Sequence, residues 1–377
     1  MREASTDVAD GVRAWSGWAH RRGVRHAEVG ELRRLMLTRD ELLSAGRTAR
    51  EIAADVRAGA LHRVRRGWYM LGDHWRELWP ESRHRALVVA VDADAGGVLG
   101  ADRDAWTAGE RRPVFCLFSA ASLLGLPLYR VEPRRAHVLV SDADRRSAPD
   151  VFRHEGAIAD ADVTEVDGIR CTSIDRTVFD MARLAAPEVA LTCADAALGR
   201  IGGDPRSYDE AAAAEWLSGM RERAGVRRVR GIRQARAIFE LADGRSQLPL
   251  ESVTKLQLWR LGFRRLGLQI PVVGPNRGRY WMDIEIEEER IYYECDGETK
   301  YTDESLRSGR TLEQVLLDEK RREDWVRGTT DHRVLRGGSA HAASADALAA
   351  RLASFGVAVP SRRAHPFLPT RPLNYGA

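Results

Sequence analysis

The sequence predicts an α+β protein built from more than one domain. Its 377 residues exceed the roughly 150 residues of an average domain, which favours two or three domains. An apolar fraction of 44% is sufficient for hydrophobic cores. The pattern of helices and strands also changes along the chain: short helices and a hairpin are expected first, and mixed α/β segments afterwards.

Composition excludes several classes of protein. No apolar run approaches the roughly 18 residues that a membrane span requires, and the N-terminal residues are too polar for a secretory signal. Four widely separated cysteines form no CxxC motif, which indicates reduced thiols and neither a disulfide framework nor a zinc site. We therefore expect a cytoplasmic protein that does not contact a membrane. The net charge of +4 permits nucleic-acid binding without requiring it.

After a leader at residues 1–26, the segment 27–80 has the pattern of a winged helix-turn-helix. A first helix is expected near Leu32. Thr38 and Glu41 form a capping-box pattern, and Thr48 is expected to cap a third helix that ends at Gly59. An alternating strand from Leu61, a glycine turn and a return strand complete the pattern as a basic two-stranded wing.

Arginines are concentrated on the third helix and the wing of this segment. They would attract phosphates if the helix entered a DNA groove, although small domains of this kind also bind proteins and their arginines can simply be solvated. The candidate DNA-binding residues are Arg47, Arg50, Arg57, Arg63, Arg65 and Arg66.

The segment 81–220 is expected to be a mixed α/β domain. Helices are predicted at 83–92, 172–184 and 189–198, and strands at 136–141 and 151–154. Ser119 is interpreted as the cap of a short helix rather than as a catalytic serine. Residues 221–245 are expected to form a basic linker helix, which is either a track for DNA or the polar face of an ordinary helix.

Residues 246–357 follow the order helix, three strands, helix, strand, helix, and the tail 358–377 is expected to be extended. The hairpin at 280–296 carries acidic residues on neighbouring strands, among them Asp283, Glu294 and Asp296. Carboxylates at such positions can converge on one divalent cation, and hard oxygen ligands suit Mg²⁺ or Mn²⁺. The alternative is a solvated hairpin with ordinary acidic positions.

Only three of the 59 basic residues are lysines, and all three lie in this last third of the chain. Lys300 follows the acidic hairpin, and Lys320 is expected on the inward stripe of the next helix. Either ammonium group could orient water or stabilise charge on a phosphate. Lys255 lies four residues after Glu251 and is interpreted as its helical ion-pair partner.

The segment from about Ser246 to Leu335 resembles the PD-(D/E)XK nuclease superfamily, in the branch related to very-short-patch-repair endonucleases (Vsr-like). The resemblance rests on Leu250-Glu-Ser, Arg279-Tyr-Trp-Met-Asp283, Tyr293-Glu-Cys-Asp-Gly-Glu-Thr-Lys-Tyr301 and Leu317-Asp-Glu-Lys-Arg-Arg-Glu-Asp324. It implies a mixed sheet flanked by helices, a nuclease-like fold that uses magnesium.

The same resemblance implies that Asp283 and Glu294 bind the metal, together with the backbone carbonyl of Cys295, and that Glu251 supports the site. The superfamily usually has a lysine two residues after the glutamate, where this chain has Asp296. Either Asp296 is a further ligand and Lys300 or Lys320 replaces that lysine, or cleavage is impaired.

Residues 30–200 separately resemble the AbiEi-type antitoxins, in which a winged helix precedes an α/β domain. The matching pieces are Arg65-Arg-Gly-Trp-Tyr, Ser119-Ala-Ala-Ser-Leu-Leu-Gly-Leu-Pro and Thr172-Ser-Ile-Asp-Arg-Thr-Val-Phe-Asp. Two functions are therefore expected from the sequence. One is a magnesium-dependent endonuclease acting on double-stranded DNA in repair, restriction or phage defence. The other is an antitoxin or transcriptional regulator with a toxin partner and a nuclease fold that does not cleave.

Overall fold

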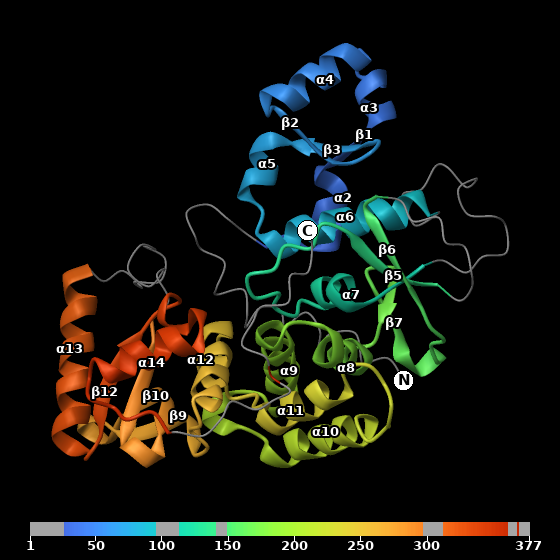
Figure 1. Ribbon diagram of the computed structural model, residues 1–377. Coiled ribbons are helices and arrows are strands. Elements are labelled where there is room, and N and C mark those ends of the chain that lie inside the picture. The colour runs from blue at the N-terminus through green and yellow to red at the C-terminus, as the bar shows by residue number, and fades with distance from the viewer. Residues whose placement is uncertain (1–25, 96–112, 141–148, 297–311, 361–367, 369–377) are drawn as a thin grey trace. The chain divides into compact units, whose positions relative to one another are not determined.

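The computed structural model describes residues 26–95, 113–140, 149–296, 312–360 and 368, which form two compact units dividing between Met181 and Ala182 (Figure 1). Both helices and sheets occur in each unit, so the α+β class is confirmed. No helix in these ranges is long and apolar enough to cross a membrane.

The first unit begins with short helices around a small sheet. Its elements are α2 (Val29–Leu35), β1 (Met36–Thr38), α3 (Arg39–Ser44), α4 (Ala49–Ala58), β2 (Leu61–Arg65) and β3 (Trp68–Leu71). The strands pair antiparallel in the order β1-β3-β2. Thr38 and Thr48 both close complete capping boxes, with Glu41 and Glu51 respectively, so both predicted helix starts are confirmed.

The rest of the first unit is a five-stranded sheet with helices, as Figure 1 shows in cyan and green. The strand order is β6-β5-β4-β8-β7, with parallel and antiparallel pairs. Helix α6 is buried on nearly all sides, which explains its continuous apolar run Ala86–Val91. The elements are α5 (Gly72–Glu77), α6 (Pro80–Asp94), β4 (Val114–Phe115), α7 (Leu117–Leu123), β5 (Ala136–Val140), β6 (Val151–Glu155), β7 (Val163–Val166), β8 (Ile169–Thr172) and α8 (Ile174–Leu184).

Ser119 lies inside α7, and the residue before this helix is Cys116, so the interpretation of Ser119 as a cap is wrong. Its buried hydroxyl accepts the N–H of His137 at 2.8 Å and lies 3.0 Å from Nε2 of His84. Because Nδ1 of His84 donates to the carbonyl of Pro133, Nε2 is the acceptor and the Ser119 hydroxyl donates to it. This fully buried serine therefore holds the core together and is not exposed to a substrate.

Two histidines of this core are held in their neutral form. Burial lowers the pKa of His84 to about 4. Burial, with smaller effects of nearby His154, His84 and Arg135, lowers the pKa of His137 to about 3. An unfolded histidine titrates near pH 6.5, so below that value the unfolded chain takes up protons that the folded unit excludes. The stability due to these histidines is present above about pH 6.5 and is lost as the pH falls towards 4.

We expect His137→Gln to reduce the acid sensitivity of the first unit. Between pH 6.5 and 4.5, the free energy of unfolding of the wild-type protein should fall by about 1.4 kcal/mol per pH unit more than that of the variant. The reason is that the variant takes up one proton fewer on unfolding. Glu81 acts in the opposite sense in both proteins, since burial raises its pKa to about 7. Urea unfolding at several pH values measures the difference, and parallel profiles for the two proteins would show that His137 is not the titrating group.

The helices of the second unit correct one prediction. They are α9 (Pro187–Gly202), α10 (Glu210–Arg223), α11 (Ile232–Leu241) and α12 (Pro249–Arg260). The expected linker helix at 221–245 is not continuous, because α10 ends at Arg223 and α11 begins only at Ile232. Gly231 precedes α11 with φ 76°, and a Cβ there would lie 1.9 Å from the carbonyl oxygen of Arg183. Only glycine fits this close approach.

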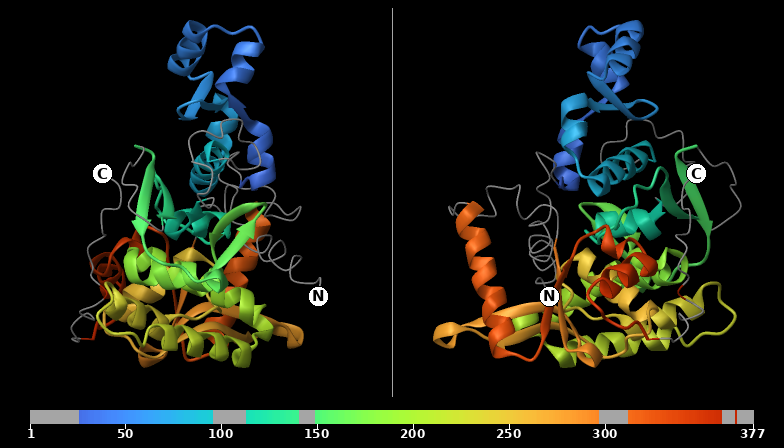
Figure 2. Two further views of the ribbon diagram at one scale, coloured as in Figure 1. Left: turned by 90° about the vertical axis from the view of Figure 1, so that its right-hand side faces the viewer. Right: turned by 60° about the vertical axis from the view of Figure 1, so that its left-hand side comes forward.

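The sheet of the second unit has the order β12-β11-β10-β9, with β12 parallel to β11 and the other pairs antiparallel. Its elements are β9 (Leu266–Val273), β10 (Arg279–Ile286), β11 (Ile291–Cys295), α13 (Leu312–Thr329), β12 (Arg333–Gly337) and α14 (Ala345–Ala353). This is the order of helices and strands expected for 246–357. Figure 2 shows the sheet with its helices from two further sides. Short 3-10 helices occur at Asp160–Asp162, Pro205–Ser207, Pro275–Arg277, Glu287–Glu289 and His341–Ala343.

Alternation along β11 assigns a helix to each face of this sheet. Tyr292 packs with Val326 of α13, and Glu294 pairs with Arg322 of the same helix. Cys295 faces the other way, where its thiol is hydrogen-bonded to Thr254 of α12. The end of β11 therefore carries polar groups towards helices on both faces of the sheet.

Candidate functional site

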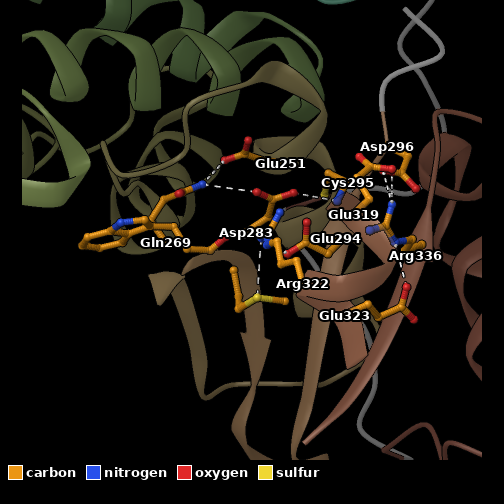
Figure 3. A network of polar contacts seen from close by, with 12 residues as sticks. Glu251, Gln269, Asp283, Glu294, Cys295, Asp296, Glu319, Arg322, Glu323 and Arg336 are labelled. Carbon is orange, nitrogen blue, oxygen red and sulfur yellow. Dashed lines mark hydrogen bonds and ion pairs between the residues drawn. The ribbon is translucent and has the colours of Figure 1, made fainter. Parts of the chain in front are cut away.

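A network of buried and half-buried carboxylates lies where β10 and β11 meet α12 and α13. Asp283 lies on β10, immediately before Ile284, which pairs with Tyr293 of β11. One of its oxygens, Oδ2, accepts the backbone N–H of Cys295 at 2.8 Å. Its other oxygen, Oδ1, lies 3.5 Å from Nε2 of Gln269, at the limit of a hydrogen bond (Figure 3).

Gln269 connects Asp283 to Glu251. Its amide nitrogen also lies 3.3 Å from Oε2 of Glu251, and its side chain is nearly buried. The backbone of Gln269 has φ 48°, which is unusual for a residue other than glycine. Strands β9 and β10 pair regularly on both sides of Gln269, at Ile270 and Leu268, but Gln269 itself is not among the paired residues. Strain of this kind accumulates at functional sites. The sequence offers no sign of it, because a glutamine in a strand pattern is unremarkable.

Glu251 occupies the place that the sequence predicts for it. It lies in the first turn of α12, is 1% exposed, and accepts the backbone N–H of Gln247 at 2.9 Å. Pro249 begins the helix and fixes the backbone at this turn. The structure thus brings Glu251 and Asp283 together through Gln269, although they are far apart in the sequence.

Glu294 is 3% exposed and pairs with Arg322, whose Nη2 lies 3.1 Å from Oε1. The same guanidinium donates to the carbonyl oxygen of Trp281. A buried carboxylate requires a compensating cation, and here the cation comes from α13. Sequence reasoning missed Arg322 because arginine is so abundant in this chain.

Lys320 does not lie on the inward face of α13, as the sequence interpretation required. It is exposed, whereas Glu319, Arg322 and Glu323 are partly buried and Val326 is fully buried. These positions recur at three and four residues, which is the period of a helix face. That spacing is the signal that identifies Arg322 in place of Lys320. Lys300 lies outside the described residues.

Asp296 follows β11 and pairs with Arg336 of β12 at 3.5 Å. Arg336 also lies 3.6 Å from Glu319 and 3.7 Å from Glu323 (Figure 3). Burial alone would lower the pKa of Arg336. The nearby carboxylates raise it by more than burial lowers it, so the net shift of the pKa is upward. Asp296 is thus neutralised by an arginine from a neighbouring strand.

Lys255 does not pair with Glu251. Its Nζ lies 2.8 Å from Oδ2 of Asp195 on α9, and the two side chains are 3% and 0% exposed. Asp195 also accepts the backbone N–H of Asp243 at 2.8 Å. The helical spacing of Glu251 and Lys255 therefore does not produce the predicted ion pair, because Lys255 contacts a carboxylate 60 residues earlier in the chain. This pair ties α12 to α9.

The donor atoms of this network suit a hard divalent cation. Asp283 and Glu294 offer carboxylate oxygens, and magnesium is often held by one or two carboxylates with water and substrate completing its shell. Burial and nearby carboxylates raise the pKa of Cys295, so its thiol stays protonated and unsuited to a metal. The described residues contain no group of three His, Cys, Asp or Glu side chains that could hold a metal ion. A cation would depend on two carboxylates and would compete with Arg322.

The candidate DNA-binding arginines of the first unit differ in exposure. Arg50, Arg57, Arg63 and Arg66 are exposed, and Arg47 is half-exposed beside Asp55 at 3.0 Å. Arg65 differs from these residues, because its side chain is only 13% exposed. Arg65 pairs with two carboxylates from later in the chain, Asp94 at 2.8 Å and Asp150 at 2.9 Å. A β-bulge between Arg63 and Arg65 interrupts the register of the hairpin at this point.

The chain matches no protein-family model, and no curated protein is significantly similar to it in sequence.

Proposed function

We propose that this protein is a DNA-binding endonuclease that hydrolyses phosphodiester bonds with Mg²⁺ or Mn²⁺. The observation that carries the proposal is that Gln269 links Asp283 to Glu251, while Asp283 accepts from the backbone of Cys295, the residue after the buried Glu294. All three carboxylates act electrostatically on Cys295. These are the three residues to which the resemblance to Vsr-like PD-(D/E)XK nucleases assigns the site. Buried carboxylates repel one another, so a bound cation would stabilise this arrangement.

In this proposal Asp283 and Glu294 hold the cation. When bound, the cation would lower the pKa of a water molecule and neutralise charge on the phosphate. Glu251 does not touch the reacting atoms. It is a positioning residue, since it accepts from Gln269, which in turn contacts Asp283. The Cys295 N–H also orients Asp283 by donating to its other oxygen.

The first unit would bind the DNA, in the manner of the winged helix that its segment 27–80 was expected to form. The exposed arginines of α4 and the hairpin β2–β3 support this assignment, because cations on one helix and an adjoining hairpin attract phosphates. Repair, restriction and phage defence are settings in which such an enzyme would act.

The second candidate is an AbiEi-like antitoxin or transcriptional regulator whose nuclease fold does not cleave DNA and which binds a toxin protein. Two ion pairs favour it. Arg322 neutralises Glu294, and Arg336 neutralises Asp296, so both carboxylates already have a cation from the chain itself. On this account the network is a structural remnant.

Incubation of the full-length protein with supercoiled plasmid separates the two candidates. The endonuclease should convert the plasmid to the nicked form with Mg²⁺ or Mn²⁺ and should stop when a chelator is added. DNA binding measured in parallel by gel shift should persist in the chelator, because the arginines need no metal. If the protein binds DNA and nicks neither plasmid nor oligonucleotides with either metal, the endonuclease is excluded and the regulator stands.

Exchange of two neighbouring arginines should have different effects. Arg66→Ala should weaken DNA binding at all sequences and lower the salt dependence of binding by about one counterion, as expected for one lost phosphate contact. Arg65→Ala should instead lower the free energy of unfolding by about 1–3 kcal/mol, because Asp94 and Asp150 lose their shared cation. Gel shifts at several salt concentrations and urea unfolding measure the two effects. Equal losses of DNA affinity without a change in stability would contradict the assignment.

A further inference from the structure

A hollow of about 660 Å³ lies in the first unit between α4, strand β2 and helix α5, elements that lie next to one another in Figure 1. Sites for small molecules usually have volumes of about 300–1,000 Å³, so this one is large enough for a ligand of several rings. Nothing in the carboxylate network or in the proposed DNA contacts requires such a space. All the residues that line it belong to one compact unit and are described.

The inner wall of the hollow is apolar. Ile52 and Val56 contribute from α4, and Leu61 and Tyr69 from the hairpin β2–β3. Ile52, Leu61 and Tyr69 form a buried cluster against which Val56 packs. These three residues expose only small parts of their side chains, so the accessible apolar surface comes mainly from half-buried Val56 and from the exposed Ala49 and Ala53. An apolar ligand would gain by covering that surface, because water leaves both partners.

Aromatic rings and small side chains give the hollow its shape. His62 and Trp75 stack face to face with ring centroids 3.9 Å apart and planes at 8°. Ala49 and Ala53 of α4 also line the hollow, where they are exposed and occupy little volume. The flat stacked rings favour an occupant with a flat body, and the two alanines leave the space for it.

The rim of the hollow is cationic. Arg39, Arg57, Arg63 and Arg76 all line it, and none of its lining residues is acidic. Arg76 also pairs with Asp73 and donates to the carbonyl oxygen of Gly59 at 3.2 Å, which holds it in place. Four guanidinium groups around an apolar wall complement a ligand with an apolar body and a negative charge.

We infer that this hollow binds a small organic anion with a flat apolar body, such as an aromatic carboxylate, sulfonate or phosphate. Arg57 and Arg63 are also among the arginines proposed to contact DNA. A ligand held by their guanidinium groups therefore competes with the DNA backbone for the same cations. This second step depends on the proposed DNA binding, whereas the site itself does not.

Fluorescence titration of the full-length protein with anilinonaphthalene sulfonate tests the site. The probe should bind with one-to-one stoichiometry. Phenylnaphthylamine, which has the same rings without the sulfonate, should bind at least about tenfold more weakly. Ala53→Trp should weaken binding of the sulfonate by about tenfold or more, because the indole fills the hollow. Ala54→Trp is the matched control. Ala54 is exposed on α4 but does not line the hollow, so this variant should keep the wild-type affinity.

Removal of one charge tests the rim separately. Arg76→Gln should weaken binding of the sulfonate but not of the neutral amine, whereas Arg34→Gln, an exposed arginine of α2 outside the hollow, should change neither. Equal affinities of the two probes, or an unchanged affinity in Ala53→Trp with the helical circular dichroism retained, would overturn the inference.

A gel shift with double-stranded DNA, run with and without saturating anilinonaphthalene sulfonate, tests the competition. The probe should weaken DNA binding by wild-type protein and leave binding by Ala53→Trp unchanged. If the protein binds DNA equally well with and without bound probe, the competition is refuted while the site stands. If it binds the probe but no DNA, the proposed DNA binding fails instead.

Discussion

Asp283→Asn and Glu294→Gln should each reduce the rate of DNA nicking by about 10³-fold while leaving DNA affinity unchanged. Both substitutions keep the size of the side chain and remove one charge that would hold the cation. Loss of metal-derived stabilisation amounts to several kcal/mol, and about 4 kcal/mol corresponds to this factor. Initial nicking rates at saturating Mn²⁺, with gel shifts for affinity, measure the effect.

Glu285→Gln is the matched control for these two substitutions. Glu285 lies on β10, two residues from Asp283, but it contacts His332 at 2.8 Å instead of the carboxylate network. The rate of nicking by this variant should stay within about twofold of the wild-type rate, because Glu285 pairs with His332 and is not among the proposed ligands of the cation. Equal losses in all three variants would indicate a general effect of charge on the sheet and would contradict specific roles for Asp283 and Glu294.

Lys255→Met should lower the free energy of unfolding of the second unit by about 3–5 kcal/mol. The substitution leaves Asp195 buried without its cation, and breaking a buried pair from one side costs this much. Burial raises the pKa of Asp195 even with Lys255 in place, so the uncompensated carboxylate is strongly disfavoured. Urea unfolding followed by circular dichroism gives the difference in free energy.

Two further variants control the Lys255 experiment. The double variant Lys255→Met, Asp195→Asn should recover most of the loss, because it removes both charges. Lys320→Met should change stability by less than about 0.5 kcal/mol, since Lys320 is exposed. A single Lys255→Met variant as stable as the wild type would mean that the pair contributes nothing.

The sequence predicts local features of this fold well. The capping box of Thr38, the helix cap of Thr48, the hairpin that begins at Leu61 and the order of elements after Ser246 are all present. Each depends on residues close together in the chain, where spacing and propensity act directly. The place of Glu251 near the start of its helix was predicted for a similar reason, because Pro249 marks that start two residues earlier.

Partners from distant segments could not be predicted. Arg65 has the sequence context of a wing residue, yet its partners Asp94 and Asp150 come from later elements. Lys255 has a helical neighbour at the right spacing but pairs with Asp195. Arg322 could not be distinguished in the sequence from the many other arginines, whereas Lys320 was chosen because lysine is rare in this chain. Spacing along a helix identifies neighbours on its face and does not identify what packs against that face.

Calorimetric titration of Mn²⁺ into the full-length protein tests the central claim most directly. The claim is that Asp283 and Glu294 take up a divalent cation in spite of Arg322. The wild-type protein and Glu285→Gln should each bind Mn²⁺, and Asp283→Asn should lose that binding while remaining folded by circular dichroism. Wild-type protein that binds no Mn²⁺, or an Asp283→Asn variant that binds it as tightly as the wild type, would contradict the account.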